Sequence, residues 1–285
     1  MDILSFIMRP PGALKVPNTR QTVRSYDLQY TEEDTMERII TFSSYSHIGS
    51  RPVNEDSCGC FSRDGKNLFV LCDGLGGHGM GDVASSLAVA CFEQQWGEHS
   101  SLAPARFLEN GFQAAQDLIL AEQKRLGASR QMKTTGVALL TDGRKAWIAH
   151  VGDSRCYVFR DGKAVRHTQD HSIPGMLALT GDIQESEIRG HSQRSILLRV
   201  LGVEGERPQP EFIKPLPLKK CDAFLLCSDG FWELIEEADM ERYLAESLTV
   251  REWLGKMATH VQEAGKDKEM DNNTAIAVWC RKGRK

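Results

Sequence analysis

Residues 68–83 constrain the fold of this 285-residue chain more than any other stretch. The apolar run at 68–72 is long enough for a fully buried strand and too short for a helix. It ends on Asp73, and five glycines follow over residues 74–81 before an apolar period predicts a helix. A carboxylate at the end of a buried strand is costly unless something binds there, and glycine lets backbone approach a ligand closely. The stretch therefore predicts a ligand site.

Two ligands compete for this site. The pattern Gly74-x-Gly76-x-x-Gly79, after a strand and before a helix, matches the dinucleotide fingerprint. Asp73 would then face a pyrophosphate, and like charges repel. A carboxylate followed by exposed carbonyl groups instead favours a hard divalent cation, which takes oxygen ligands. We therefore favour a metal site over a dinucleotide site.

Similar carboxylates recur at the ends of other predicted strands. Asp153 follows the strand at 146–151, and Asp229 follows the buried strand at 223–227. Asp271 instead precedes the strand at 275–280. If that strand is antiparallel to its neighbour, its start lies where the other strands finish. We therefore expect Asp73, Asp229 and Asp271 to meet at one edge of the sheets.

A cluster of carboxylates requires neutralising cations. Carboxylate, carbonyl and water ligands suit Mg²⁺ or Mn²⁺, whereas zinc prefers histidine and cysteine. Two such ions acidify a bound water, and an arginine such as Arg51 suits a phosphoryl group. The residues themselves thus predict metal-assisted hydrolysis of a phosphoester. His150 lies inside a predicted strand, and we interpret it as a core or edge histidine rather than a ligand.

Charge and composition exclude several other classes of protein. The formal net charge is -4, which gives no footprint for nucleic acid, and no apolar run approaches a membrane span. The beginning of the chain is not typical of a secretory signal. Eight cysteines occur without a C-x-x-C pair, so we interpret them as reduced and buried, and the protein as cytoplasmic. We expect no nucleic-acid or membrane partner and a monomer.

We expect three segments. Residues 1–38 form a proline-containing, poorly ordered extension; residues 39–281 form the main domain; and residues 282–285 form a basic tail. A polar excursion at about 172–196 is typical of a flap over a site.

Helices are expected between the strands. One begins near Asp82 as N-cap, one at Pro104, one at Phe231, and one after a capping box at Thr249.

Seven elements carry a family resemblance when taken in order. They are Arg51-x-x-Asn-Glu-Asp56, Asp73-Gly-x-Gly-Gly-His-x-x-Gly81, Thr134-Thr-Gly136, Gly152-Asp-Ser-Arg155, Asp170-His-Ser172, Ser228-Asp-Gly230 and Asp271-Asn-x-Thr274. The series resembles that of the protein phosphatase 2C family, the metal-dependent serine/threonine phosphatases, over about residues 40–280. The Gly-Gly-His form and His191-x-Gln-Arg194 resemble its bacterial branch.

The resemblance implies a fold and an activity. The fold is an α+β, four-layer α/β/β/α sandwich of two antiparallel sheets flanked by helices, with a flap subdomain. The activity is hydrolysis of phosphoserine and phosphothreonine in proteins by a metal-activated water. In bacteria a serine/threonine kinase usually opposes such an enzyme. The alternatives are a non-catalytic module that binds a partner through the same surface, and a phosphatase dedicated to one regulatory protein.

The resemblance also implies residue roles. Asp73 would bridge two Mn²⁺ or Mg²⁺ ions, the Gly74 carbonyl would hold one, and Asp229 and Asp271 the other. Arg51 matches the phosphate-binding arginine. Glu55 and Asp56 match the acidic pair near the site, and Asp56 also lies near the metals. Asp153 matches the ligand of a third, weaker metal.

One position departs from the family pattern. Eukaryotic members place a histidine, the proposed general acid, directly after the Asp-Gly pair, and here that position is Leu75. Metal-bound water or another group would have to protonate the leaving group. His78 is near in sequence, but the loop can equally use it as a brace.

Overall fold

Two antiparallel sheets form the centre of the computed structural model, which describes residues 24–27, 38–75, 79–128 and 131–282. Sheet A has six strands, in the spatial order β1 (Arg24–Asp27), β2 (Arg38–His47), β11 (Asn273–Lys282), β10 (Ala223–Cys227), β7 (Arg155–Arg160) and β8 (Lys163–Arg166). Sheet B has five, in the order β3 (Asp56–Arg63), β4 (Lys66–Asp73), β5 (Gly136–Thr141), β6 (Lys145–Val151) and β9 (Glu211–Pro217).

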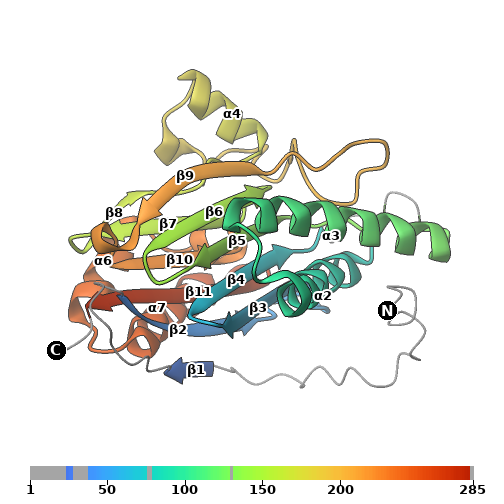
Figure 1. Cartoon of the computed structure of the whole chain (residues 1–285). Helices are drawn as coiled ribbons and strands as arrows, with labels where there is room; N and C mark the ends of the chain where they lie inside the picture. Colours follow the sequence, from blue (N-terminus) through green and yellow to red (C-terminus); the bar gives the residue numbers. More distant parts are fainter. Residues whose placement is uncertain (1–23, 28–37, 76–78, 129–130, 283–285) are drawn as a thin grey trace.

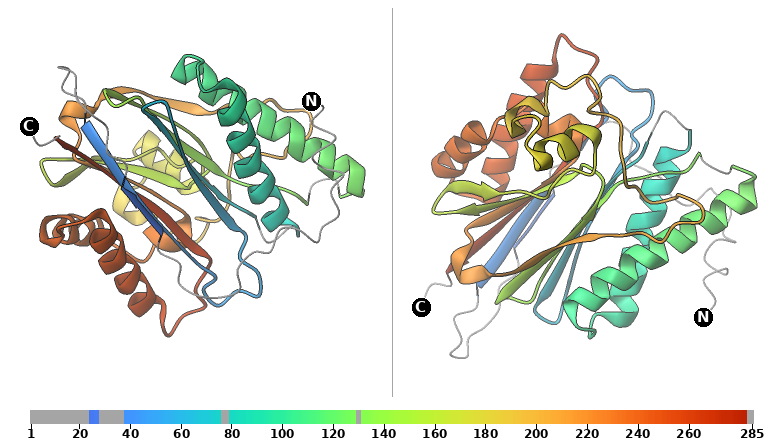
Figure 2. Two further views of the ribbon diagram at one scale, coloured as in Figure 1. Left: turned by 60° about the horizontal axis from the view of Figure 1, so that its bottom comes forward. Right: turned by 90° about the horizontal axis from the view of Figure 1, so that it is seen from above.

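Helices cover the outer face of each sheet. The long helices α2 (Gly81–His99) and α3 (Pro104–Leu126) pack on sheet B. On sheet A lie α5 (Asp229–Trp232), α6 (Glu237–Glu246) and α7 (Val250–Gly265). The two sheets face one another between these helical layers (Figures 1 and 2). The expected four-layer α/β/β/α sandwich is confirmed.

The central strands are unbroken apolar runs in the sequence because successive side chains point to opposite faces of the sheet and both faces are buried. In β10, Ala223, Leu225 and Cys227 face the helices, whereas Phe224 and Leu226 face the other sheet. Strand β4 divides its side chains in the same way between α2/α3 and sheet A. Both faces of these strands are buried, so neither face can be polar.

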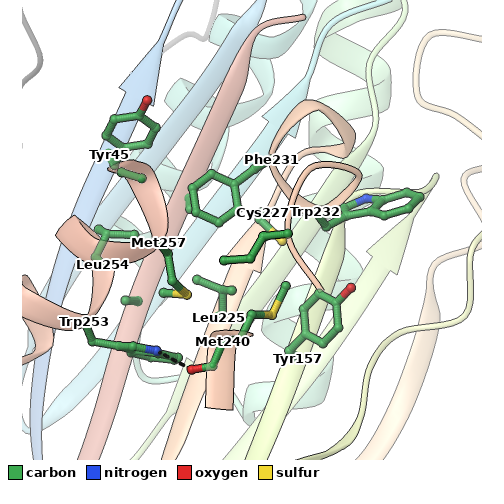
Figure 3. Packing of buried hydrophobic residues seen from close by; sticks show 14 of the residues in the cluster. Tyr45, Tyr157, Leu225, Cys227, Phe231, Trp232, Met240, Trp253, Leu254 and Met257 are labelled. Carbon is green, nitrogen blue, oxygen red and sulfur yellow. Dashed lines mark hydrogen bonds between the residues drawn. The ribbon is translucent and has the colours of Figure 1, made fainter. Parts of the chain in front are cut away.

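Aromatic and methionine side chains fill the layer between sheet A and its helices (Figure 3). Trp253 of α7 packs edge-on against Phe159, with ring centroids 5.2 Å apart. Its indole N–H donates to the Met240 carbonyl at 3.0 Å. Burying such large rings contributes most of the hydrophobic stabilisation in this layer.

One expected helix cap and one expected helix start are wrong. Helix α2 begins at Gly81, and its N-cap is Met80 in the left-handed region (φ 60°), so Asp82 lies inside the first turn and does not cap the helix. Helix α5 begins at Asp229 rather than Phe231. The other two starts are confirmed: α3 begins at Pro104, and the Thr249 side chain accepts a hydrogen bond from Glu252 N.

The flap is closed at its base by backbone pairing. It contains α4 (Ile173–Thr180) and the 3₁₀ turn η2 (Glu185–Glu187), and projects beyond the sandwich (Figure 1). Ser172 bridges Leu197, and Leu198 N donates to His171 O at 2.7 Å. The excursion thus leaves and rejoins the sheets at adjacent points.

Most of the extension expected at 1–38 lies outside the described residues, and Arg24–Asp27 within it form the edge strand β1 beside β2. Residues 283–285 of the basic tail also lie outside them. All eight cysteines are described and free of disulfides; six are buried, and Cys58 and Cys60 are partly exposed. Among the described helices, none has the length and hydropathy of a membrane span.

Candidate active site

Strand ends bring the predicted carboxylates together. Asp73, at the end of β4, lies directly opposite Asp56, the first residue of β3. In sheet A, Cys227 pairs with both Ala275 and Arg155. The residues just beyond these positions are Asp229, Asp271 and Asp153. The charges of these carboxyl groups act on one another, and we call the group Asp56, Asp73, Asp153, Asp229 and Asp271 the carboxylate cluster.

Electrostatics show that this arrangement is unfavourable without cations. Burial raises the pKa of Asp73 well above its usual range, and the charges of Asp56, Asp229 and Asp153 raise it further. Burial likewise raises the pKa of Asp153. The pKa of Asp56 is raised to about 7 by burial, although a hydrogen bond from Ser228 opposes this shift. Divalent cations would reverse these shifts.

An unpartnered atom within the cluster fits a cation. Asp56 Oδ2 accepts a hydrogen bond from Ser228 Oγ at 2.8 Å, whereas Asp56 Oδ1 is buried and has no hydrogen-bond partner among the described residues. A buried carboxylate oxygen without a partner is costly. The donor set is made of oxygens, so it suits Mn²⁺ or Mg²⁺.

Gly74 has the close backbone approach that its sequence position predicts. A Cβ atom there would lie 2.3 Å from Gly81 O and 2.7 Å from Glu55 O. Any larger residue would push the β4 end away from α2 and β3. Gly74 therefore lets Asp73 lie against the adjoining strand and helix.

The sequence-predicted Arg51 and Glu55 lie at the rim. The Arg51 side chain is exposed, and its Nη2 lies 2.7 Å from Asp271 Oδ2. Glu55 is half-buried; burial and then the charge of Asp82 raise its pKa. Leu75 is fixed by its backbone N–H, which donates to Lys133 O at 3.0 Å. His78 lies outside the described residues.

Comparison with known proteins agrees with this geometry. The sequence profile of the protein phosphatase 2C family matches residues 44–272. The chain belongs to this family. It is 34% identical over 234 residues to the serine/threonine phosphatase Stp of Listeria innocua, which covers 80% of this chain and 90% of that protein. The chain is accordingly a protein-serine/threonine phosphatase.

Two solved structures are similar throughout the sandwich. Serine/threonine phosphatase Stp1 from Staphylococcus aureus superposes with a TM-score of 0.75 at 29% identity, covering 89% of this chain and 99% of that one. The catalytic domain of the serine/threonine phosphatase PstP, in complex with two manganese ions, gives 0.70 at 25% identity, covering 85% and 98%. A manganese-binding relative thus shares the fold of this phosphatase.

Sequence reasoning did not assign the residues that hold the cluster in place. Asn272 donates from Nδ2 to Ile48 O and Val53 O, and its Oδ1 accepts from Glu55 N at 2.8 Å. Thr134 and Thr135 fix Asp73: Thr135 Oγ1 accepts from Asp73 N, and Thr134 Oγ1 donates to Asp73 O. These three residues belong to the motif series that resembles the family, but only the folded chain shows which backbone groups they bind.

A buried ion pair joins the cluster to the hinge of the flap. Arg155 makes two hydrogen bonds to Asp170, at 2.9 and 2.7 Å, and its guanidinium stacks on Trp232 at 3.6 Å from the ring centroid. Trp232 Nε1 in turn donates to Asp153 O at 3.1 Å. Arg194 of the flap pairs with Glu233, four residues after Asp229, at 2.7 Å.

Proposed function

We propose that this phosphatase hydrolyses phosphoserine and phosphothreonine esters in proteins at the carboxylate cluster, using two Mn²⁺ or Mg²⁺ ions. The observation that carries the proposal is the gathering of five aspartates, in which the buried Asp56 Oδ1 has no partner among the described residues. Bound divalent cations in such a site acidify a water molecule, which then serves as the nucleophile.

Asp73, the Gly74 carbonyl, Asp229 and Asp271 would hold the two ions, with Asp56 beside them. Asp153 would hold a third, weaker ion.

Arg51 and Glu55 have complementary roles at the rim. Arg51 is charged and exposed, so it can leave Asp271 and bind the phosphoryl group of a substrate through two parallel hydrogen bonds. Glu55 and Asp56 orient the attacking water. The Leu75 side chain carries no proton to donate, so protonation of the leaving group falls to water or to another residue.

The cellular setting is part of the proposal. We expect a serine/threonine kinase to phosphorylate the substrates that this enzyme dephosphorylates, in the cytoplasm, with the phosphatase acting as a monomer. We propose the division expected from the sequence, with an extension at 1–38, a main domain at 39–281 and a flap at 172–196, although Arg24–Asp27 of the extension add the edge strand β1 to sheet A. A single dedicated regulatory substrate would be recognised by the flap or the extension.

A manganese-dependent assay on phosphoserine and phosphothreonine peptides tests this function. Wild-type chain should release phosphate with Mn²⁺ and stop with a chelator, and Asp229→Asn should be inactive. A well-folded wild-type chain that binds Mn²⁺ without releasing phosphate would instead indicate a non-catalytic binding module.

A further inference from the structure

Three potential metal ligands meet beside the hinge of the flap, outside the carboxylate cluster. His150 lies on β6 opposite Glu211 of β9, and His171 lies where the chain enters the flap. One ligand atom from each residue lies within 4.8 Å of the others. The His150 side chain is fully buried and His171 nearly so, whereas the Glu211 side chain is 47% exposed. We call these three residues the histidine cluster.

His150 presents a free lone pair inside the protein. Its Nε2 lies 2.7 Å from Gln169 O, and a carbonyl can only accept, so the neutral ring carries its proton on Nε2. Nδ1 is then unprotonated, and it is buried without a hydrogen-bond partner in the part of the chain that the structure describes. Metal-binding histidines have this arrangement, with one nitrogen free and the other donating to a carbonyl or carboxylate. Our interpretation of His150 as a core histidine accounts for its burial but not for its unpartnered Nδ1.

His171 and Glu211 already have the spacing of neighbouring metal ligands. His171 Nε2 lies 3.3 Å from Glu211 Oε2. Ligands about 2.0–2.1 Å from a tetrahedral ion lie roughly 3.3–3.4 Å from one another. The exposed Glu211 side chain can adjust, and the His150 and His171 rings, stacked with centroids 4.5 Å apart, need a rotation to converge on one ion.

We propose that His150 Nδ1, His171 Nε2 and Glu211 bind one divalent transition-metal ion of the zinc class. Two imidazoles and one carboxylate form a zinc donor set, with a fourth position left for water. This set does not suit Mg²⁺, which takes oxygen ligands. The histidine cluster and the carboxylate cluster would thus select different ions within one chain.

Binding would have a consequence for the neighbouring active site. Gly152 N donates to His171 Nδ1 at 3.2 Å, so the metal-free ring carries its proton on Nε2. An ion on Nε2 replaces that proton, which moves to Nδ1 while the ring stays neutral. The hydrogen bond from Gly152 is then lost, and Gly152 directly precedes Asp153. The proposed metal would loosen the backbone that carries Asp153.

Zinc titration of the full chain in saturating Mg²⁺ tests the proposal by calorimetry. Wild type should bind one Zn²⁺ ion per chain. Glu211→Gln should raise the dissociation constant for zinc by more than roughly 10-fold, because it removes the anionic ligand. Glu206→Gln makes the same charge change at an exposed position of the connection before β9 and is the matched control.

X-ray absorption at the zinc edge should show two imidazole ligands. Hydrogen exchange at 150–155 should increase on zinc binding.

Two outcomes would overturn the proposal. Zinc binding that survives Glu211→Gln and is lost in Asp271→Asn would place the ion in the carboxylate cluster. Equal loss of binding in Glu211→Gln and Glu206→Gln would mean that only overall charge matters. His150→Gln is a weaker test, because a fully buried substitution can unfold the chain; the absorption spectrum of wild type decides the ligands without it.

Discussion

The carboxylate cluster and the histidine cluster lie at the same end of the two sheets, yet they differ in every property that selects an ion. The first gathers five aspartates, and burial, followed by the charges of neighbouring carboxyl groups, raises the pKa values of Asp56 and Asp73. The second stacks two histidines whose pKa values are lowered, chiefly by burial. Oxygen ligands favour Mn²⁺ or Mg²⁺, and imidazoles favour zinc. Position at a strand end thus creates a site, and residue type decides its ligand.

The largest expected effect is loss of catalysis when the carboxylate cluster loses one ligand. Asp271→Asn should lower kcat/KM by roughly 10³-fold or more, since metal-based stabilisation contributes several kcal/mol. Asp222→Asn is the matched control, because Asp222 precedes β10 at the opposite end of the sheet, and asparagine can still accept the hydrogen bond from Gly162 N. Phosphopeptide turnover in Mn²⁺ measures both. Retained activity in Asp271→Asn would refute the metal assignment.

The buried ion pair between Arg155 and Asp170, at the hinge of the flap, gives the next largest effect. Arg155→Met leaves Asp170, which is 1% exposed, without its cation. Removing one partner of a buried ion pair costs about 3–5 kcal/mol, so the free energy of unfolding in urea should fall by that amount. Arg160→Met, at the exposed end of the same strand, should cost much less. Equal losses would show that Arg155 is not an anchor of the hinge.

The two clusters should also respond to pH with opposite signs in chelator-treated protein. The folded-state pKa of Asp56 is raised to about 7, so the folded chain holds an extra proton between about pH 4 and 7, and stability falls as pH rises. The folded-state pKa of His171 is lowered to about 4, so the unfolded chain holds the extra proton up to about pH 6.5, and stability rises with pH.

Urea unfolding at several pH values separates these contributions. Asp56→Asn should reduce the falling contribution, to which Asp73 and Asp153 also add, and His171→Gln should reduce the rising one, to which His150 also adds, each by at most a few kcal/mol. Adding Mn²⁺ should abolish the first contribution and leave the second. Parallel pH profiles for the two variants would contradict the opposite signs.

The contrast also shows what the sequence could predict. The carboxylate cluster was predictable because each member lies beside a buried strand, where a charge is unfavourable unless a ligand compensates it. The histidine cluster was not, because it depends on the register of β6 with β9, which includes a bulge between Ala146 and Ile148, and on the path of the flap. The Asp82 cap failed because the glycine loop enters α2 through a left-handed Met80, a backbone conformation that the local sequence does not specify.

The smallest effect should come from Arg51, at the exposed rim. Its pair with Asp271 is solvent-screened and contributes little to stability, so Arg51→Ala should leave the free energy of unfolding within about 1 kcal/mol of wild type. The KM for a phosphopeptide should rise roughly 10-fold, because a charge-assisted contact to the phosphoryl group contributes about 1.5–3 kcal/mol. Arg51→Lys should recover part of this loss, since lysine keeps the charge without the planar fork. An unchanged KM in Arg51→Ala would assign phosphate binding to the metal ions alone.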